Sequence, residues 1–186
     1  MTDFPKSIDC GDFRLEKVAP TFDVARYLFE LVDSQREYMA QWLEWVDKSN
    51  CPEDMYPHLL KASGVTHPGY YIIVDDKIVG AIDLVRVDEK HKTVEIGYWL
   101  SRDYNGRGIM TRAVHAMEKL AFDMLGMHRV EIRADVRNKK SCAVAERAGY
   151  VYEGVLRGAY VLRGVPTDIA VRSKLKSEWE KENKNA

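Results

Sequence analysis

A glycine-containing loop between a predicted strand and a predicted helix most constrains how this chain folds. Residues 94–100 (VEIGYWL) are rich in β-branched and aromatic side chains, as strands are. From Val114 to Gly126, apolar residues recur at helical spacing. Between the two lies YNGRGIMT, residues 104–111. A helix that begins there presents unpaired N–H groups and the positive end of its dipole, which suits an anion such as phosphate.

This loop matches neither of two common nucleotide motifs. A P-loop has a lysine directly after its last glycine, and none follows Gly108. A dinucleotide fingerprint has a third glycine where this chain has Thr111. Thr111 is expected to cap the helix, with Arg102, Arg107 and Arg112 adding positive charge. These residues alone indicate that the loop binds a phosphate group, but they do not identify the ligand. They also allow a plain turn before an ordinary helix.

The remaining pattern predicts one α/β domain. Helices are expected at about residues 23–32, with Asp23 as N-cap, and at 34–46, 52–64, 114–125 and 141–148. Strands are expected at residues 13–18, 70–74, 78–87, 94–100, 129–136, 150–162 and 167–175. The 186 residues contain no repeat or linker, so the core is expected to span about 13–176, before a polar tail that frays.

Composition excludes several classes of protein. The net charge is −1, far from the strongly basic face typical of nucleic-acid binders. We expect no membrane span, no secretory signal and no metal site. Three scattered cysteines argue against a disulfide framework and favour the cytoplasm. Residues 1–101 carry 11 Lys/Arg and 18 Asp/Glu, whereas residues 102–149 carry 10 and 6, which suits a polyanionic cofactor beside a cationic substrate.

Two motifs in order resemble those of a known family. Residues 105–110 (NGRGIM) resemble the Q/R-x-x-G-x-G/A signature of the GNAT superfamily of N-acetyltransferases. Residues 138–141 (NKKS) and 146–150 (ERAGY) resemble its N-x-x-S…G-F/Y motif. Residues 95–100 (EIGYWL) are most similar to the branch that includes the bacterial ribosomal-protein serine N-acetyltransferases. Residues 42–43 and 178–179 fit that branch too, so the resemblance covers residues 13–179.

The resemblance implies a GNAT-type mixed, twisted sheet with helices on both faces, and acetyl-CoA as acyl donor. Glu95 is the expected base for the amine proton, and Ser141 the expected proton donor to the departing thiolate. Glu95 also fits a strand carboxylate that is bonded to a neighbour or faces outward, and Ser141 fits a helix N-cap. The residues expected to bind the cofactor are Trp99, Leu100, Gly106, Arg107, Gly108, Ile109, Met110, Thr111 and Asn138.

Three positions depart from the family pattern. Asn105 stands in place of Gln or Arg, and Met110 in place of Gly or Ala. Both positions are expected to act through backbone N–H groups, so cofactor binding should survive. Other members use a tyrosine acid seven residues after the motif asparagine, and that position is Ala145 here.

The acceptor is predicted less sharply than the donor. The ribosomal-protein resemblance implies a protein N-terminal amine. The alternatives are a small-molecule N-acetyltransferase for polyamines, amino sugars or amino acids, and a non-catalytic acyl-CoA-binding module. A homodimer through the tyrosine-rich strand at 150–160 is also expected. An acidic groove wall favouring a cationic amine is expected from Asp33, Glu37, Glu44, Asp47, Glu53 and Asp54.

Overall fold

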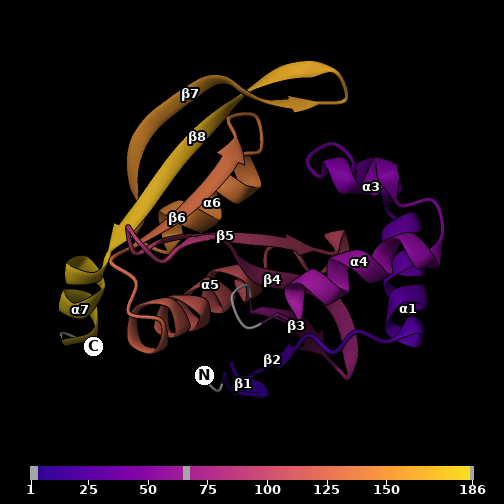
Figure 1. Ribbon diagram of the computed structural model, residues 1–186, viewed down its shortest axis with the longest axis horizontal. Helices are drawn as coiled ribbons and strands as arrows, with labels where there is room; N and C mark the ends of the chain where they lie inside the picture. Colours follow the sequence, from indigo (N-terminus) through magenta and orange to yellow (C-terminus); the bar gives the residue numbers. More distant parts are fainter. Residues whose placement is uncertain (1–3, 65–67, 185–186) are drawn as a thin grey trace.

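The protein is built on one eight-stranded mixed sheet (Figure 1). The computed structural model describes residues 4–64 and 68–184. Along the sheet the strands follow the order β1-β2-β3-β4-β5-β6-β8-β7. Their bounds are β1 Ser7–Asp9, β2 Arg14–Lys17, β3 Gly69–Val74, β4 Lys77–Asp88, β5 Thr93–Leu100, β6 Arg129–Asp135, β7 Val151–Leu162 and β8 Val165–Leu175. The expected mixed sheet is confirmed, and β1 is an additional edge strand that the sequence pattern did not reveal.

Helices lie on both faces of this sheet, also as expected. Their bounds are α1 Phe22–Asp33, α2 Arg36–Met39, α3 Glu44–Lys48, α4 Pro52–Ala62, α5 Ile109–Lys119, α6 Lys139–Arg147 and α7 Lys176–Lys184. Strand β3 is buried along its whole length and separates two apolar clusters. Tyr70 and Ile72 pack with α5 and α6, whereas Tyr71 and Ile73 pack with α1 to α4. Alternate side chains of a strand point to opposite faces, so β3 holds the two layers together.

The N-terminal helices differ from the prediction in two respects. Thr21, rather than Asp23, caps α1, because its Oγ1 accepts a hydrogen bond from the Val24 N–H at 3.2 Å. The single helix expected at 34–46 is instead two short helices, α2 and α3. The Arg36 guanidinium donates to the carbonyls of Val46 (2.6 Å) and Ser49 (2.8 Å). These bonds tie α2 to α3 and stabilise the irregular backbone that joins the two helices and follows α3. This break places Trp42 and Leu43 in a connecting turn.

The expected fraying of the C-terminal tail is wrong for the part that the structure describes. Residues 176–184 form α7. The fully buried Lys174 Nζ donates to Glu182 at 2.7 Å and lies 3.3 Å from the buried Glu118. Trp179 packs against Phe122 with ring centroids 5.4 Å apart. The Lys174–Glu182 ion pair and the Trp179–Phe122 contact together hold α7 against the sheet.

Candidate active site

Strands β5 and β6 separate partway along their length. They run parallel to each other, and their pairing extends only from Thr93–Arg129 to Glu95–Glu131. Beyond that point β5 continues to Leu100 and β6 to Asp135 while diverging (Figure 1). The edge of β5 from Ile96 to Leu100 therefore has unpaired backbone groups that an extended ligand can join as an added strand.

The loop that follows β5 has the geometry of an anion site. Gly106 and Gly108 adopt left-handed φ angles of 80° and 70°, which favour glycine. A Cβ added at either position would meet nothing within 4 Å, so open space borders the backbone there. Gly108 is the N-cap of α5, so the first N–H groups of this helix face the same space. Thr111 lies in the first turn, and its expected role as cap is wrong.

Thr111 nevertheless faces the ligand space. Its hydroxyl is buried and has no hydrogen-bond partner among the described residues, and it lines the cleft between the loop and α6. We call this space the loop cleft, and its lining includes Tyr104, Gly106, Gly108, Thr111, Lys139 and Arg147. A buried, unpaired donor at the start of a helix suits a phosphate oxygen.

The positive charge in the loop cleft comes only partly from the predicted arginines. Arg112 pairs with Asp12 and donates to the Cys10 carbonyl at 3.0 Å, so it points toward the N-terminal strands. Arg107 remains beside the loop, stacked on Tyr104 at 4.9 Å. Additional cations come from α6, which the sequence analysis missed: Lys139, Lys140 and Arg147 line the opposite wall.

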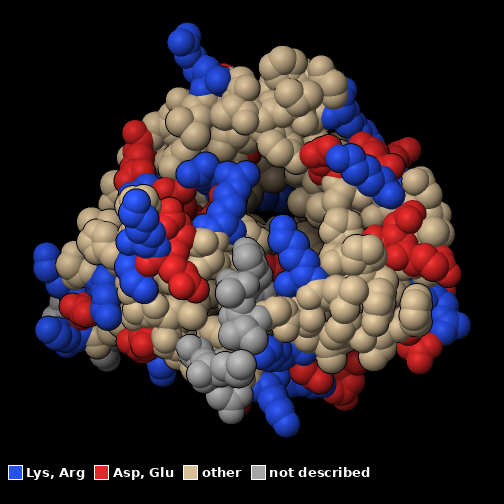
Figure 2. Space-filling model, viewed as in Figure 1, with Lys and Arg blue, Asp and Glu red and all other residues tan. Residues whose placement is uncertain are grey.

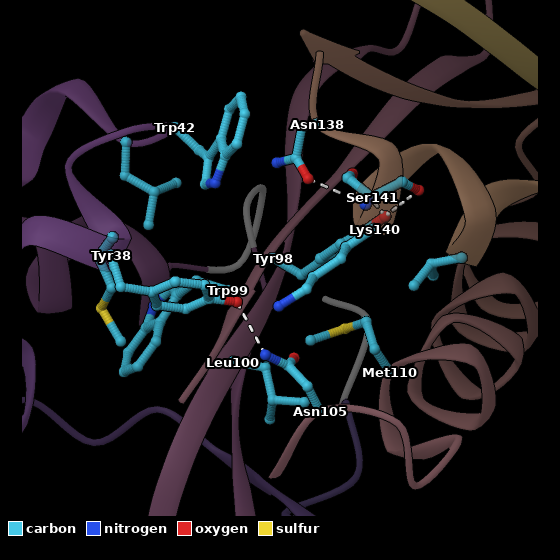
Figure 3. A pocket seen from close by; sticks show the side chains of 13 residues that line it. Tyr38, Trp42, Tyr98, Trp99, Leu100, Asn105, Met110, Asn138, Lys140 and Ser141 are labelled. Carbon is cyan, nitrogen blue, oxygen red and sulfur yellow. Dashed lines mark hydrogen bonds between the residues drawn. The ribbon is translucent and has the colours of Figure 1, made fainter. Parts of the chain in front are cut away.

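The loop cleft continues into a pocket at the end of β5 (Figure 3). Asn105 Nδ2 donates to the Tyr38 hydroxyl at 2.8 Å, and the Lys140 ammonium lies 5.1 Å above the Tyr38 ring. Gln35 fixes the same loop, since it donates to Ser101 Oγ (2.8 Å) and accepts from the Arg102 N–H (2.7 Å). We call this space the β5 pocket; its volume is about 110 Å³, and its lining includes Tyr38, Trp42, Tyr98, Trp99, Leu100, Met110 and Ser141.

Ser141 faces this pocket beside the half-buried Tyr98 (Figure 3). Asn138, rather than Ser141, is the N-cap of α6, and its Oδ1 accepts a hydrogen bond from the Ser141 N–H at 3.1 Å. The Ser141 hydroxyl is 2.9 Å from the Tyr98 hydroxyl. Burial raises the pKa of Tyr98 to about 12, so this phenol stays protonated. Tyr98 could not be recognised from the sequence pattern, because its partner Ser141 lies 43 residues away on another element.

Glu95 lies in an adjoining space, the Glu95 cleft, which shares Trp42, Leu43, Tyr98, Asn138 and Ser141 with the β5 pocket. Its side chain is only 14% exposed, and Oε2 lies 3.4 Å from Arg86 and 3.6 Å from Arg133. Burial raises the pKa of the Glu95 carboxyl, and the two guanidinium groups partly oppose that shift. The structure therefore brings Glu95, from β5, and Ser141, from α6, to the same cleft.

A hairpin closes over the Glu95 cleft. Near the tip of β7 and β8, the Tyr160 hydroxyl donates to Glu44 Oε2 at 2.8 Å, and Arg163 pairs with Asp47 at 2.6 and 2.5 Å. Figure 1 shows this hairpin reaching across to α3, and Figure 2 shows a hollow beneath it. The hairpin therefore bounds the opening of the Glu95 cleft.

The acidic wall expected along the first helices is largely neutralised. Asp33 pairs with Arg36, Glu44 with Lys48, and Asp47 with Arg163. Asp54 accepts the backbone N–H groups at the start of α4. Because these carboxylates are already paired, they offer little attraction to a cationic acceptor.

No helix in the described ranges has the length and apolarity that crossing a membrane requires. Within residues 4–64 and 68–184, no group of three or more His, Cys, Asp or Glu side chains is arranged to hold a metal ion.

Comparisons with known proteins agree with this geometry. The model of the GNAT acetyltransferase domain matches residues 12–151. The "Putative ribosomal N-acetyltransferase YdaF" of Bacillus subtilis is 31% identical over 166 residues, which cover 85% of this chain and 89% of that protein. The ribosomal-protein-serine acetyltransferase of Escherichia coli K12 is 28% identical over 152 residues, covering 80% and 85%. Its spermidine N(1)-acetyltransferase is 24% identical over 144 residues, covering 75% and 74%.

A solved structure shows the same fold with the donor bound. The microcin C7 self-immunity acetyltransferase MccE, crystallised with acetyl-CoA and AMP, is 28% identical to this chain. The TM-score is 0.82, with 94% of this chain and 98% of that chain covered.

The matched family and the donor-bound MccE structure place this chain among acyltransferases that use a coenzyme A thioester. A helix start open to anions and a free strand edge fit such a donor. The chain belongs to the GNAT family of acetyltransferases. It is an acetyl-CoA-dependent N-acetyltransferase, as the sequence motifs predict. The residues present fit this donor, because the unpartnered Thr111 hydroxyl and the open glycine backbone match a pyrophosphate.

Proposed function

We propose that this enzyme acetylates the N-terminal amine of a protein, as the names of its ribosomal relatives suggest. The observation that carries the proposal is the opening beneath the β7–β8 hairpin, which leads to Glu95. An extended chain end is narrow enough to enter this opening. A lysine on the surface of a folded protein would reach Glu95 only if the rest of that protein pressed against the hairpin.

We assign the donor site to the residues that border the loop cleft and the β5 pocket. The backbone of Gly106–Thr111 and the Arg107 side chain hold the pyrophosphate. The free edge of β5 at Trp99 and Leu100 pairs with the pantetheine arm, and Asn138 Nδ2 donates to one of its amides. This assignment uses the strand edge that β6 leaves unpaired.

We assign the chemistry to Glu95 and Ser141. Glu95 accepts a proton from the ammonium, directly or through water, and so produces a neutral amine. The amine nitrogen bonds to the thioester carbonyl carbon, whose oxygen accepts from a backbone N–H at the end of β5. As the carbon–sulfur bond breaks, Ser141 Oγ gives its proton to the sulfur. The attacking nitrogen, which carries an extra proton once it has bonded to carbon, returns that proton through water to Ser141, whose hydroxyl Tyr98 holds in place. Glu95 then releases its proton to solvent.

A polyamine acceptor is the second candidate, because a spermidine N(1)-acetyltransferase also matches the chain. The two candidates separate in one assay. Purified enzyme is given acetyl-CoA and either peptides with free or blocked N-termini or spermidine, and thiol release is recorded. We expect turnover with free N-terminal peptides and none with blocked ones. Turnover with spermidine alone would contradict the protein-acceptor proposal.

Ser141→Ala is expected to lower kcat on the order of 10-fold to 100-fold, because a proton donor to the departing sulfur is lost. The affinity for CoA should change less than about two-fold, since Ser141 contributes no charge to the loop cleft. Stopped-flow thiol release and calorimetry measure the two quantities. Tyr98→Phe is the companion variant, which removes the hydroxyl 2.9 Å from Ser141. Equal turnover of wild type and Ser141→Ala would remove Ser141 from the chemistry.

We also propose that the chain folds as one domain that pairs through β7. This strand is at one edge of the sheet, and Val151, Tyr152 and Val155 on it are exposed. Light scattering of the purified protein tests the pairing, and Val155→Glu is expected to favour the monomer.

A further inference from the structure

A second cleft opens from the acyl-transfer site, on the side of α4. It meets the β5 pocket at Leu43, Tyr98 and Trp99, and its volume is about 320 Å³. We call it the Asp83 cleft, because Asp83 of β4 is the acidic residue among those that line it. A cavity of this size matches the lower end of known ligand sites.

One oxygen of the Asp83 carboxylate lacks a partner within the described part of the chain. Its Oδ1 is buried and has no hydrogen-bond partner among the described residues. Burial raises the pKa of Asp83 to about 7, while the nearby Lys61 ammonium opposes that shift. A buried carboxylate oxygen without a hydrogen-bond partner is energetically costly. A ligand that brings positive charge to Asp83 Oδ1 would therefore be stabilised there.

Two glycines make room around this carboxylate. A Cβ added at Gly69 would stand 2.4 Å from Asp83 Oδ1, so that side chain fits only because position 69 has none. Gly97 of β5 lies directly opposite Asp83 in the sheet. A Cβ at Gly97 would meet only Val85, at 3.5 Å, which is an ordinary contact distance. Tight packing therefore does not require glycine at this position, and the missing side chain keeps the cleft open.

Aromatic side chains line the same cleft. Trp45 and Trp99 meet edge to face with centroids 6.2 Å apart, and His58 lies 5.9 Å from Trp45. Burial lowers the pKa of His58, which favours its neutral form. Aromatic walls beside a carboxylate form an environment that favours an alkylammonium group.

Asp83 and Glu95 share one face of the sheet. Gly97 pairs with Asp83, and Glu95 pairs with Val85, so the two carboxyl-bearing residues are diagonal neighbours on adjacent strands. Such neighbours are about 7–8 Å apart. This spacing suits two amines separated by a short alkyl chain, one at each carboxylate.

We propose that the Asp83 cleft binds a second, alkylammonium group of the acceptor while its reacting amine lies at Glu95. This inference rests on the proposed function, in which the acceptor is an amine. The second ammonium comes either from a lysine side chain at the protein N-terminus or from the far end of a polyamine. The paired acidic residues of α3 and α4 do not supply this selectivity, whereas Asp83 does.

The test compares acceptors that differ only in the second charge. Peptides beginning with lysine are compared with peptides beginning with norleucine, and butane-1,4-diamine is compared with butylamine. For whichever pair is turned over, Asp83→Asn is expected to raise the KM of the dicationic acceptor about ten-fold or more, while the KM of the monocationic acceptor changes less than about two-fold. Gly97→Ala, which narrows the cleft without altering Asp83, should produce the same selective loss. Glu89→Gln is the matched control, because this exposed residue lies just beyond β4 and outside the cleft.

The outcomes separate this inference from the proposed function. Selectivity with the peptide pair supports lysine as the source of the ammonium, and selectivity with the diamine pair supports a polyamine. If no peptide is acetylated, the proposed function fails, and calorimetry then tests the cleft alone: butane-1,4-diamine should bind wild type about ten-fold more tightly than Asp83→Asn. Equal effects of Asp83→Asn on both members of each pair, or equal diamine affinity of the two proteins, would overturn the inference.

Discussion

Gly108→Asp is expected to weaken acetyl-CoA binding by at least about 100-fold, which corresponds to about 2.7 kcal/mol. Two physical effects combine in this variant. Gly108 has a φ of 70°, a conformation that costs other residues about 1–2 kcal/mol. The new carboxylate would also lie at the start of α5, where it competes with the pyrophosphate for the same N–H groups and repels its charge.

Two further variants separate these effects. Gly108→Ala keeps the strain without the charge, so its loss of affinity should be smaller. Gly126→Asp is the matched control, because Gly126 has a φ of 62°, also borders open space, and lies beyond the opposite end of α5. Isothermal calorimetry measures all three. If Gly108→Asp binds acetyl-CoA as tightly as Gly126→Asp does, the loop is not the pyrophosphate site.

Glu95→Gln is expected to reduce kcat/KM for the amine by about 10²- to 10⁴-fold, the range typical of a lost general base. The amide keeps the shape of the side chain but cannot accept the proton. Binding of acetyl-CoA should be unchanged, since Glu95 lines the acceptor side of the β5–β6 gap and not the loop cleft. A rate within about two-fold of wild type at every pH would assign the base elsewhere.

The pH dependence of kcat/KM gives the same residue a second test. Glu95 must be ionised to accept a proton, so activity should fall as the pH drops through its raised pKa. Arg86→Gln removes a charge that lowers this pKa, so the acid limb of the profile should move to higher pH. Glu131→Gln removes a carboxylate that raises it, so the limb should move to lower pH. Opposite shifts from the two variants would identify Glu95 as the titrating group, and coincident profiles would contradict that assignment.

Local patterns in the sequence predicted the glycine loop and the helix that follows it. The glycines at 106 and 108 and the helix after them are neighbours in the chain, so their geometry follows from short-range rules. The same holds for the alternating strands that make the sheet. Asn138 and Ser141 likewise lie within one helical turn, joined by a hydrogen bond across the start of α6.

Features that depend on distant pairs were missed. Tyr98 and Ser141 meet only after β5 and α6 pack together. The polar tail was expected to fray from its composition. In the fold, Lys174 pairs with the buried Glu118 and also with Glu182 of the tail, a contact that the local sequence does not reveal. Asp47 of α3 pairs with Arg163 on the β7–β8 hairpin 116 residues later, so the free negative charge of this wall was overestimated. Asp83 was not singled out, because nothing in its neighbourhood along the chain reveals that the fold leaves its Oδ1 without a hydrogen-bond partner among the described residues.

A crystal structure of the enzyme with CoA tests the central claim most directly. We expect the pyrophosphate within hydrogen-bond distance of the backbone N–H groups of residues 106–111, and the pantetheine amides paired with the free edge of β5 at Trp99 and Leu100. The thiol should then point into the space shared by Ser141 and Glu95. Diphosphate density away from the start of α5, or a pantetheine arm that does not enter the gap between β5 and β6, would contradict this account.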